Sequence, residues 1–245
     1  MIPGIIHYCW FGRNPLPPSA RKCIESWRKF FPDYEIKEWN EDNFDTSMIP
    51  YIRDAYAAGK YAFVSDFARM WILYQYGGLY FDTDVEVIRP MDDIVAAGAF
   101  MGCEIDGGTG SEIMVNPGLG LGVEAGNTIF GQIIDFYSRH DFYNAEGLIN
   151  TCAIVRITTD TLVNNGMMNR SGLQRVQGIT IYPSEWFNPL DDATGRLNVT
   201  ECTRSIHWFS KTWMNVSPFR QWLSRMSHRF IGVKMMGIIR NILKR

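Results

Sequence analysis

Residues 63–85 read FVSDFARMWILYQYGGLYFDTDV, and the expected fold and chemistry of the chain depend on this stretch. From Ala62 to Tyr76 nearly every residue is apolar or aromatic, which predicts a helix that is buried on all sides. Two glycines then end the helix, and the apolar run LYF predicts a short buried strand. Asp82 and Asp84 follow that strand directly. Two carboxylates in this position offer hard oxygen ligands to a divalent cation.

Three polar residues interrupt the apolar helix. Ser65, Asp66 and Arg69 are spaced so that they share one helical face. A carboxylate and a guanidinium in a core must be paired, hydrogen-bonded or in contact with a ligand. The helix therefore predicts a polar site beside the two aspartates, and a purely structural ion pair between Asp66 and Arg69 is the alternative.

The length and composition are those of a single α/β domain. The chain has 245 residues, of which 46% are hydrophobic and 14% aromatic, enough to fill one sizeable core. The five cysteines are scattered without C-x-x-C spacing, which indicates buried thiols in a reducing compartment.

Residues 1–10 resemble a first strand rather than a signal peptide, and no apolar stretch approaches the roughly 18 to 20 residues of a membrane-spanning helix. We therefore expect one catalytic domain, residues 1–215, in the cytoplasm.

The net charge of −2 conceals an asymmetry along the chain. Residues 1–201 hold 15 basic and 26 acidic residues, whereas residues 202–245 hold nine basic residues and no acidic one. In residues 231–245, apolar and basic side chains fall on opposite arcs of a helical wheel. This pattern predicts a helical tail, residues 216–245, on an anionic membrane surface, with docking on its own domain as the alternative. The acidic body and the lack of a nucleic-acid motif argue against nucleic acid as a partner.

Strand and helix patterns alternate along the chain without an internal repeat. The predicted strands are residues 5–10, 34–39, 79–81, 85–88, 99–103, 178–182 and 205–209. The predicted helices are residues 20–31, 49–58, 62–76, 91–97 and 127–139, and residues 150–164 fit either a helix or a strand. This alternation predicts an α/β fold, a mixed and mostly parallel sheet with helices on both faces.

Two segments are expected to be loops. Residues 104–126 are rich in glycine, and residues 183–189 read PSEWFNP. Within the first, GLGVEA at residues 120–125 matches the G-x-G-x-x-A form of a dinucleotide fingerprint, but no strand pattern precedes it. A nicotinamide or flavin site is therefore not expected.

Residues at the ends of other predicted strands extend the candidate site. Tyr8 and Trp10 close the first strand, in position to stack on a base, although core packing explains them equally well. His207 lies on the last predicted strand and adds an imidazole to Asp82 and Asp84. The carboxylates favour Mg²⁺ or Mn²⁺, and the imidazole favours Mn²⁺. Such an ion is suited to clamp a diphosphate and to stabilise the charge that grows on it as it leaves.

Four segments together carry a resemblance to a known family. They read IPGIIHYCWFG at residues 2–12, SDFAR at 65–69 with GGLYFDTD at 77–84, YPSEWFNP at 182–189 and IHWFSKTW at 206–213. These motifs resemble glycosyltransferase family 32, which contains bacterial capsule and lipopolysaccharide sugar transferases and fungal mannosyltransferases and is related to the clostridial glucosylating toxins. The resemblance implies a GT-A fold, a nucleotide-sugar donor, a divalent metal and retention of the anomeric configuration.

The resemblance also implies roles for individual residues. Asp84 would bind the metal directly, and Asp82 would hold the ribose or donor sugar and assist the metal. Asp66 and Arg69 would contact the donor sugar. The candidate donor-binding residues are Tyr8, Trp10, Ser65, Asp66, Arg69, Asp82, Asn116, Thr212 and Trp213. The candidate catalytic residues are Asp82, Asp84 and Arg69, and the candidate metal ligands are Asp84, Asp82 and His207.

The implied site is completed from the C-terminal side. His207, Thr212 and Trp213 would close over the metal and the diphosphate. Trp208 stands where many family members have a second histidine, and Thr212 replaces a serine. Relatives often carry Thr-Gly-Pro near residues 158–160, which read TTD here, so the acceptor side is unassigned.

These observations predict a retaining glycosyltransferase that moves a hexose from a UDP- or GDP-hexose to a glycan or lipid-linked saccharide, with Mn²⁺ or Mg²⁺ as cofactor. The expected setting is bacterial surface polysaccharide synthesis, capsular or lipopolysaccharide, at the inner face of the cell membrane. One alternative is an aspartate-nucleophile phosphatase built on Asp82-x-Asp84, which would have Thr or Val where Glu86 stands. The other is a non-catalytic sugar- or metal-binding module.

Overall fold

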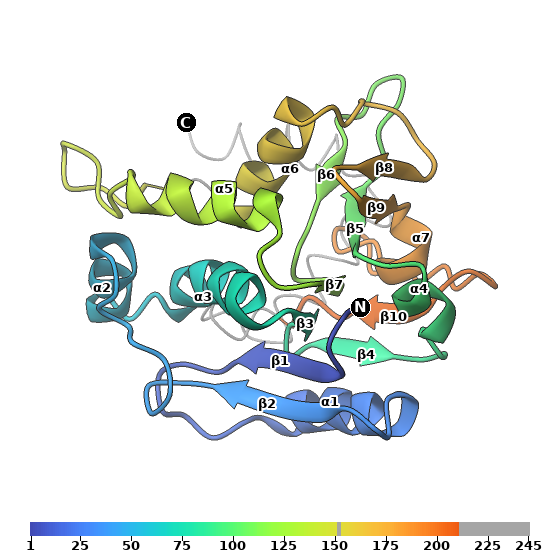
Figure 1. The fold of residues 1–245 in the computed structure, drawn as a ribbon, viewed down its shortest axis with the longest axis horizontal. Helices are drawn as coiled ribbons and strands as arrows, with labels where there is room; N and C mark the ends of the chain where they lie inside the picture. Colours follow the sequence, from blue (N-terminus) through green and yellow to red (C-terminus); the bar gives the residue numbers. More distant parts are fainter. Residues whose placement is uncertain (151–152, 211–245) are drawn as a thin grey trace.

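A central mixed sheet organises the chain. The computed structural model describes residues 1–150 and 153–210. Within them an eight-stranded sheet has the order β2-β1-β3-β7-β5-β9-β8, with β6 paired to β5, and β4 and β10 form a separate two-stranded sheet (Figure 1). The strands are β1 (Ile5–Cys9), β2 (Glu35–Trp39), β3 (Gly78–Tyr80), β4 (Val85–Val87), β5 (Phe100–Ile105), β6 (Met114–Val115), β7 (Leu121–Val123), β8 (Gln174–Val176), β9 (Ile179–Tyr182) and β10 (Ser205–His207).

Most strands of the central sheet run in one direction. β1 lies parallel to β2 and β3, and β5 lies parallel to β9. β7 is antiparallel to both β3 and β5, so β2, β1, β3, β5 and β9 share one direction. β6 and β8 pair antiparallel with β5 and β9. The prediction of an α/β fold with a mixed, mostly parallel sheet is confirmed.

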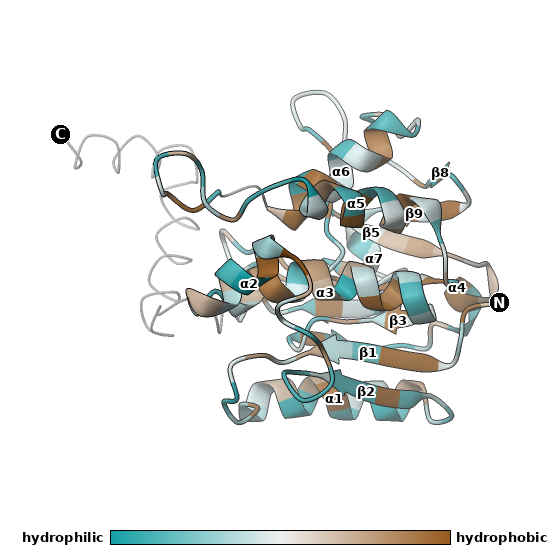
Figure 2. Ribbon diagram, turned by 60° about the vertical axis from the view of Figure 1, so that its left-hand side comes forward, coloured by the Kyte–Doolittle hydropathy of each residue, from teal (hydrophilic) through white to brown (hydrophobic). Residues whose placement is uncertain are grey.

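Helices cover both faces of this sheet. They are α1 (Pro18–Phe30), α2 (Pro50–Ala57), α3 (Tyr61–Tyr76), α4 (Asp92–Ala96), α5 (Thr128–Ser138), α6 (Ile154–Asn164) and α7 (Ser184–Phe187). One hydrophobic cluster joins α2, α3, α5 and α6 to the sheet, and a second joins α1, α4 and α7. Along β1, Cys9 belongs to the first cluster whereas Ile6 and Tyr8 belong to the second, as the alternation of a strand requires. Polar and apolar residues alternate along α1, which buries one face (Figure 2).

Two glycines form the turn that connects the end of α3 to β3. Gly77 ends the helix at a φ of 64°, and Gly78 follows at 107°, both values that favour glycine. A Cβ on Gly78 would lie 2.7 Å from a backbone oxygen of β1. Burial lowers the pKa of His7 to about 4, so its neutral ring accepts from Trp39 Nε1 at 3.0 Å and donates from Nε2 to the Gly77 carbonyl at 2.9 Å. α3 therefore passes directly into β3.

Residues 104–126, predicted to be a long loop, contain two strands, so that prediction is wrong. β6 and β7 both lie in this segment, and β7 occupies the middle of the sheet between β3 and β5. Gly122 on β7 permits close packing, because a Cβ there would lie 2.6 Å from Leu79 Cδ2 and would overlap the Phe100 ring. A three-residue strand with a central glycine carries little of the side-chain signal by which strands are recognised. The GLGVEA match lies on β7 itself rather than in a strand-to-helix turn.

Two further segments are helical. Residues 183–189, predicted to be a loop, contain the short helix α7. Its first turn is held by Ser184, whose backbone N–H and hydroxyl donate to the Asp106 carboxylate at 2.9 and 2.7 Å. Residues 150–164, for which helix and strand fitted equally, contain α6.

Part of the prediction falls outside the described residues, namely Thr212, Trp213 and the tail of residues 216–245. Among the helices of the described residues, none combines the length and the apolar character needed to cross a bilayer.

Candidate active site and metal centre

A cavity of about 710 Å³ opens at the carboxyl ends of β1 and β3. Ligands of open α/β sheets bind at this edge, and the volume falls within the roughly 300–1,000 Å³ of small-molecule sites. α3 contributes Ser65, Asp66 and Arg69 to the lining, and the residues after β3 contribute Asp82 and Asp84. Other parts of the chain contribute Cys9, Trp10, Asn116, Ile154, His207 and Phe209.

Arg69 joins the helix to the first aspartate. Its Nη2 lies 3.1 Å from Asp66 Oδ1 and 3.0 Å from Asp82 Oδ1, and its side chain is only 5% exposed. Tyr80 OH also donates to Asp82 Oδ1, at 3.2 Å. A buried guanidinium between two carboxylates is paired, as its desolvation requires. Arg69 therefore orients Asp82 as well as pairing with Asp66, which the spacing along the helix alone did not reveal.

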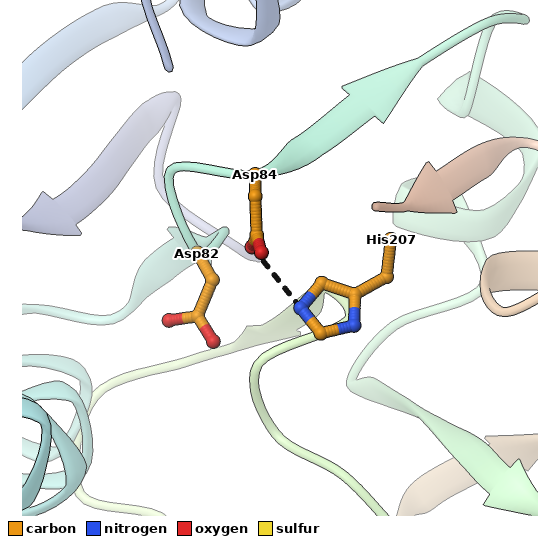
Figure 3. A group of neighbouring side chains, drawn as sticks. All are labelled: Asp82, Asp84 and His207. Atoms are coloured by element: carbon orange, nitrogen blue, oxygen red, sulfur yellow. Dashed lines mark ion pairs between the residues drawn. The ribbon is translucent and has the colours of Figure 1, made fainter. Parts of the chain in front are cut away.

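Asp84 and His207 meet because β4 and β10 pair antiparallel. The register sets His207 opposite Val85, and the Trp208 N–H donates to the Asp84 carbonyl at 3.0 Å. His207 Nε2 then lies 3.0 Å from Asp84 Oδ1 (Figure 3). The second oxygen of Asp84 accepts from the backbone N–H and the hydroxyl of Ser210, at 2.8 and 3.0 Å. Ser210 is thus a supporting residue that the sequence reasoning missed, although it lies inside the IHWFSKTW motif.

Local charges set the protonation of these groups. Burial raises the pKa of Asp84, but the charge and hydrogen bond of His207 and the hydrogen bonds of Ser210 outweigh burial and lower that pKa to about 2. Burial lowers the pKa of His207, and Asp84 outweighs it, so this pKa lies above its usual value. Burial raises the pKa values of Asp66 and Asp82 against the opposing charge of Arg69.

The three candidate metal ligands converge. Asp82, Asp84 and His207 each offer one ligand atom, and these atoms lie within 4.8 Å of one another (Figure 3). Two carboxylate oxygens and one imidazole nitrogen form a donor set that suits Mn²⁺. The residues present therefore fit a divalent cation.

The other predicted donor-binding residues divide between the cavity and the core. Trp10 and Ser65 line the cavity. Tyr8 does not, because it packs edge-on against Trp27 with ring centroids 5.8 Å apart and donates to Glu38 Oε2 at 2.6 Å. The structure does not bring Tyr8 into the site, since alternation along β1 turns it to the face opposite Cys9.

The turn after β6 supports Asp82 from behind. Asn116 Oδ1 accepts from the Gly118 N–H at 2.7 Å, while its Nδ2 donates to Glu104 Oε2 at 2.8 Å. The Gly118 carbonyl accepts from the Asp82 N–H at 3.2 Å. A Cβ at position 118 would overlap Asp82 Oδ2 and would lie 3.0 Å from Arg69 Nη1. Sequence reasoning missed Gly118, because Asn-Pro-Gly indicates a turn without revealing what packs on it.

Comparison with known proteins covers the part of this site that α3 and the two aspartates contribute. Residues 17–101 match the family model of the glycosyltransferase sugar-binding region containing the DXD motif. Over 98 residues the chain is 33% identical to inositol phosphoceramide mannosyltransferase 3 of Schizosaccharomyces pombe, covering 38% of this chain and 27% of that protein. Over 109 residues it is 34% identical to an uncharacterized glycosyltransferase of Acanthamoeba polyphaga mimivirus, covering 41% of this chain and 42% of that protein. The chain thus matches less than half the length of these relatives.

A solved structure is also similar. It is a galactosyltransferase in complex with donor and acceptor sugar analogues, with 13% identity, a TM-score of 0.43, and coverage of 96% of this chain and 95% of the other. The family match includes all of α3 together with Asp82 and Asp84. Residues 17–101 are thus similar to the sugar-binding region of glycosyltransferases that contain a DXD motif.

Proposed function

We propose that the chain is a metal-dependent GT-A glycosyltransferase that transfers a hexose from a nucleotide sugar to a saccharide acceptor, with retention of anomeric configuration. The observation that carries the proposal is the convergence of Asp82, Asp84 and His207 beside the Arg69–Asp66 pair in one cavity. The match of residues 17–101 to a sugar-binding region supports the same activity.

Different residues of the cavity would bind the metal ion and the donor sugar. Asp84, Asp82 and His207 would hold Mn²⁺ or Mg²⁺, and the ion would stabilise the negative charge of the departing diphosphate. Arg69 and Asp66 would bind hydroxyls of the donor sugar through charge-assisted hydrogen bonds. Transfer breaks the bond from the anomeric carbon to the diphosphate, forms the bond to the acceptor oxygen, and moves the acceptor's hydroxyl proton to the departing diphosphate.

The names of the relatives favour one donor. Two of them are inositol phosphoceramide mannosyltransferases, so GDP-mannose is the first donor to test and the UDP-hexoses are the next. The proposed acceptor is a surface glycan or a lipid-linked saccharide.

The test is incubation of the purified chain with Mn²⁺ and a panel of GDP- and UDP-hexoses, with release of the nucleoside diphosphate as the readout. We expect release from one class of donor, loss of release on treatment with EDTA, and recovery when Mn²⁺ is restored. Asp84→Ala should weaken Mn²⁺-dependent nucleotide binding by at least roughly tenfold. Asp92→Ala, at an exposed aspartate of α4, is the matched control and should bind as the unmodified chain does.

Three outcomes would count against the proposal. The first is no release from any donor, together with unchanged metal and nucleotide binding in Asp84→Ala. The second is hydrolysis of phosphomonoesters, which would favour the phosphatase alternative, although the contact of Asp82 Oδ1 with Arg69 makes this carboxylate a weaker nucleophile. The third is tight donor binding without turnover on any acceptor, which would favour a binding module.

The basic C-terminal segment supports a proposal about location. Residues 216–245 hold seven basic residues and no acidic one. We propose that this segment attaches the enzyme to the anionic inner face of the cell membrane. Vesicles containing phosphatidylglycerol should sediment the protein at low salt and release it at high salt, whereas phosphatidylcholine vesicles should not. Equal binding to both kinds of vesicle would contradict this proposal.

A further inference from the structure

A second cavity adjoins the candidate active site and has no part in the functions proposed so far. It has a volume of about 480 Å³, and Phe209 lines both cavities. The two cavities are also joined by a hydrogen bond. Asn116, which lines the first cavity, donates to Glu104, which lines the second, at 2.8 Å. The Phe209 ring and the hydrogen-bonded Glu104–Asn116 pair therefore separate a ligand in the second cavity from a ligand in the first.

The lining of the second cavity offers hydrogen-bond acceptors. Of the described residues that line it, none is basic and four are carboxylates, namely Glu104, Glu185, Asp191 and Asp192. Asn188 Nδ2 donates to the backbone carbonyl of Glu104 at 3.2 Å, which fixes the orientation of the amide. Within residues 1–150 and 153–210, Asn188 Oδ1 is buried and finds no hydrogen-bond partner. Such an oxygen costs free energy unless a donor reaches it, and a sugar hydroxyl is one such donor.

The cavity wall is held in place before any ligand binds. Asp191 Oδ1 accepts from the N–H groups of Ala193 and Thr194 at 2.9 and 3.1 Å, which closes the turn at one side of the cavity. Glu185 Oε2 accepts from the Thr200 hydroxyl at 3.0 Å. Among the described residues, the other oxygens of Asp191 and Glu185 take part in none of these hydrogen bonds, so these two carboxylates present fixed acceptors of the kind that give a small-molecule site its specificity.

The apolar part of the lining completes the match to a sugar. Ile105, Pro189, Leu190 and Phe209 contribute apolar surface. A hexopyranose has one apolar C–H face and a rim of hydroxyl donors, which suits apolar surface combined with several acceptors. Four carboxylates disfavour an anionic ligand, because like charges brought together without a counter-ion repel.

We propose that the second cavity binds the acceptor, as a neutral hexopyranose whose hydroxyls donate to the cavity carboxylates and to Asn188 Oδ1. This inference rests on the proposed sugar transfer in the first cavity. The acceptor hydroxyl then reaches the donor from the Phe209 side, and a sugar ring that itself carries a carboxylate or phosphate is excluded from the cavity by charge.

The experiment separates acceptor binding from donor use. With the donor found in the panel, release of nucleoside diphosphate to water measures donor use. Added methyl glycosides of glucose, galactose, mannose and N-acetylglucosamine measure transfer, and methyl glucuronide is the charged probe. Ala193→Trp fills the second cavity, Asn188→Ala removes the unpartnered oxygen, and Ala57→Trp at the exposed end of α2 is the matched control. Thermal melts and Mn²⁺-dependent nucleotide binding verify that each variant is folded.

We expect the unmodified chain to use at least one neutral glycoside and not the glucuronide. Ala193→Trp should lose at least roughly 90% of transfer while donor hydrolysis stays within about twofold, as one bulky side chain blocks the cavity. Asn188→Ala should raise the acceptor KM by roughly three- to tenfold, the effect of one hydrogen bond. Ala57→Trp should change neither rate.

Several results would overturn the assignment. Transfer by Ala193→Trp at the unmodified rate would locate the acceptor elsewhere, and an equal loss of transfer and hydrolysis would make the cavity part of the donor site. Use of the glucuronide, or of no neutral glycoside, would contradict the charge argument. By contrast, failure of the proposed function itself would appear as no donor hydrolysis by the unmodified chain.

Discussion

Arg69 is the positively charged residue that pairs with two carboxylates of the site. Its guanidinium is nearly fully buried and pairs with both Asp66 and Asp82. Burial alone would neutralise these two carboxylates, and the raised pKa values of both reflect it. The planar fork of arginine serves two carboxylates at once, which the single ammonium of lysine does less well. The charge of Arg69 opposes the increase in pKa and so favours the charged form of Asp82, next to the candidate metal ligand Asp84.

Gly118 provides a residue-scale test of how tightly Asp82 is held. In Gly118→Ala the new Cβ would overlap Asp82 Oδ2, so Asp82 and Arg69 must shift. We expect Mn²⁺-dependent nucleotide binding to weaken by at least roughly tenfold and the free energy of unfolding to fall by about 1–3 kcal/mol. Isothermal titration and urea denaturation measure the two effects. Gly4→Ala, where a Cβ meets nothing within 4 Å, is the control, and equal behaviour of the two variants would contradict the prediction.

His207 provides a test by pH. Asp84 raises the pKa of His207 against the effect of burial, so a proton competes with a metal ion for the ring. As pH rises through this raised pKa, the proton leaves and the affinity for Mn²⁺ should increase. Asp84 contributes little to the change, because its pKa of about 2 keeps it charged throughout. Mn²⁺ titrations at pH 6 and pH 8 measure the effect.

The control for the pH experiment is His207→Ala. This variant should bind Mn²⁺ more weakly at pH 8 and should lose most of the pH dependence. The same pH dependence in the variant as in the unmodified chain would show that another group titrates.

At the scale of elements, the site depends on two strands of three residues each. β4 is held by α1, since Trp27 Nε1 donates to the Val85 carbonyl at 2.8 Å and the Ser26 hydroxyl accepts from the Val87 N–H at 2.9 Å. β10 then pairs with β4 and brings His207 to Asp84. Helix α1 therefore supports the metal centre without lining it.

Arg89 follows β4 and provides a test of how the pairing of β4 with β10 supports the site. Its Nη1 donates to the carbonyls of Thr200 and Thr203 at 2.5 and 2.7 Å, which holds the segment that leads into β10. In Arg89→Leu these carbonyls lose their donor, so β10 should loosen and Mn²⁺ affinity should fall by roughly three- to tenfold. Titration with Mn²⁺ measures the change. Arg175→Leu, on the exposed side of β8, is the matched control, and equal affinities in the two variants would contradict the prediction.

At the scale of the whole molecule, the metal centre forms only when several parts of the chain are folded together. Asp82 and Asp84 follow β3, His207 comes from β10, and the turn holding Gly118 packs behind them. An ion bound by this arrangement and not by the unfolded chain must stabilise the fold by mass action. Metal binding should therefore raise the free energy of unfolding of the whole domain, and the domain should unfold in one cooperative transition.

Thermal unfolding with and without Mn²⁺ tests this coupling. At 100 times its dissociation constant, Mn²⁺ should stabilise the folded chain by about 2.7 kcal/mol, which raises Tm by roughly 5–11 °C for a domain of this size. EDTA should reverse the shift, and Asp84→Ala should abolish it. The control Asp33→Ala, at an exposed position, should retain it. An equal shift in both variants would mean that Mn²⁺ binds elsewhere.

The local sequence of residues 63–85 was enough to predict the core of the site. Helix α3, its glycine end, the strand β3 and the two aspartates all follow from nearest-neighbour chemistry, because apolar periodicity and glycine conformation act over a few residues. The grouping of Ser65, Asp66 and Arg69 on one face follows from helix geometry in the same way.

The tertiary structure decided what depends on distant partners. Four features required residues far apart in the chain: the strand β7, the close packing of Gly118 on Asp82, the position of Tyr8 in the core, and the contact of Asp84 with His207. Strands of three residues show no periodicity, and their partners are selected by packing over the whole sheet. The sequence alone determined which chemical groups are present at the site, and only the fold determined which of them touch, because contacts between distant segments are set by the packing of the whole domain.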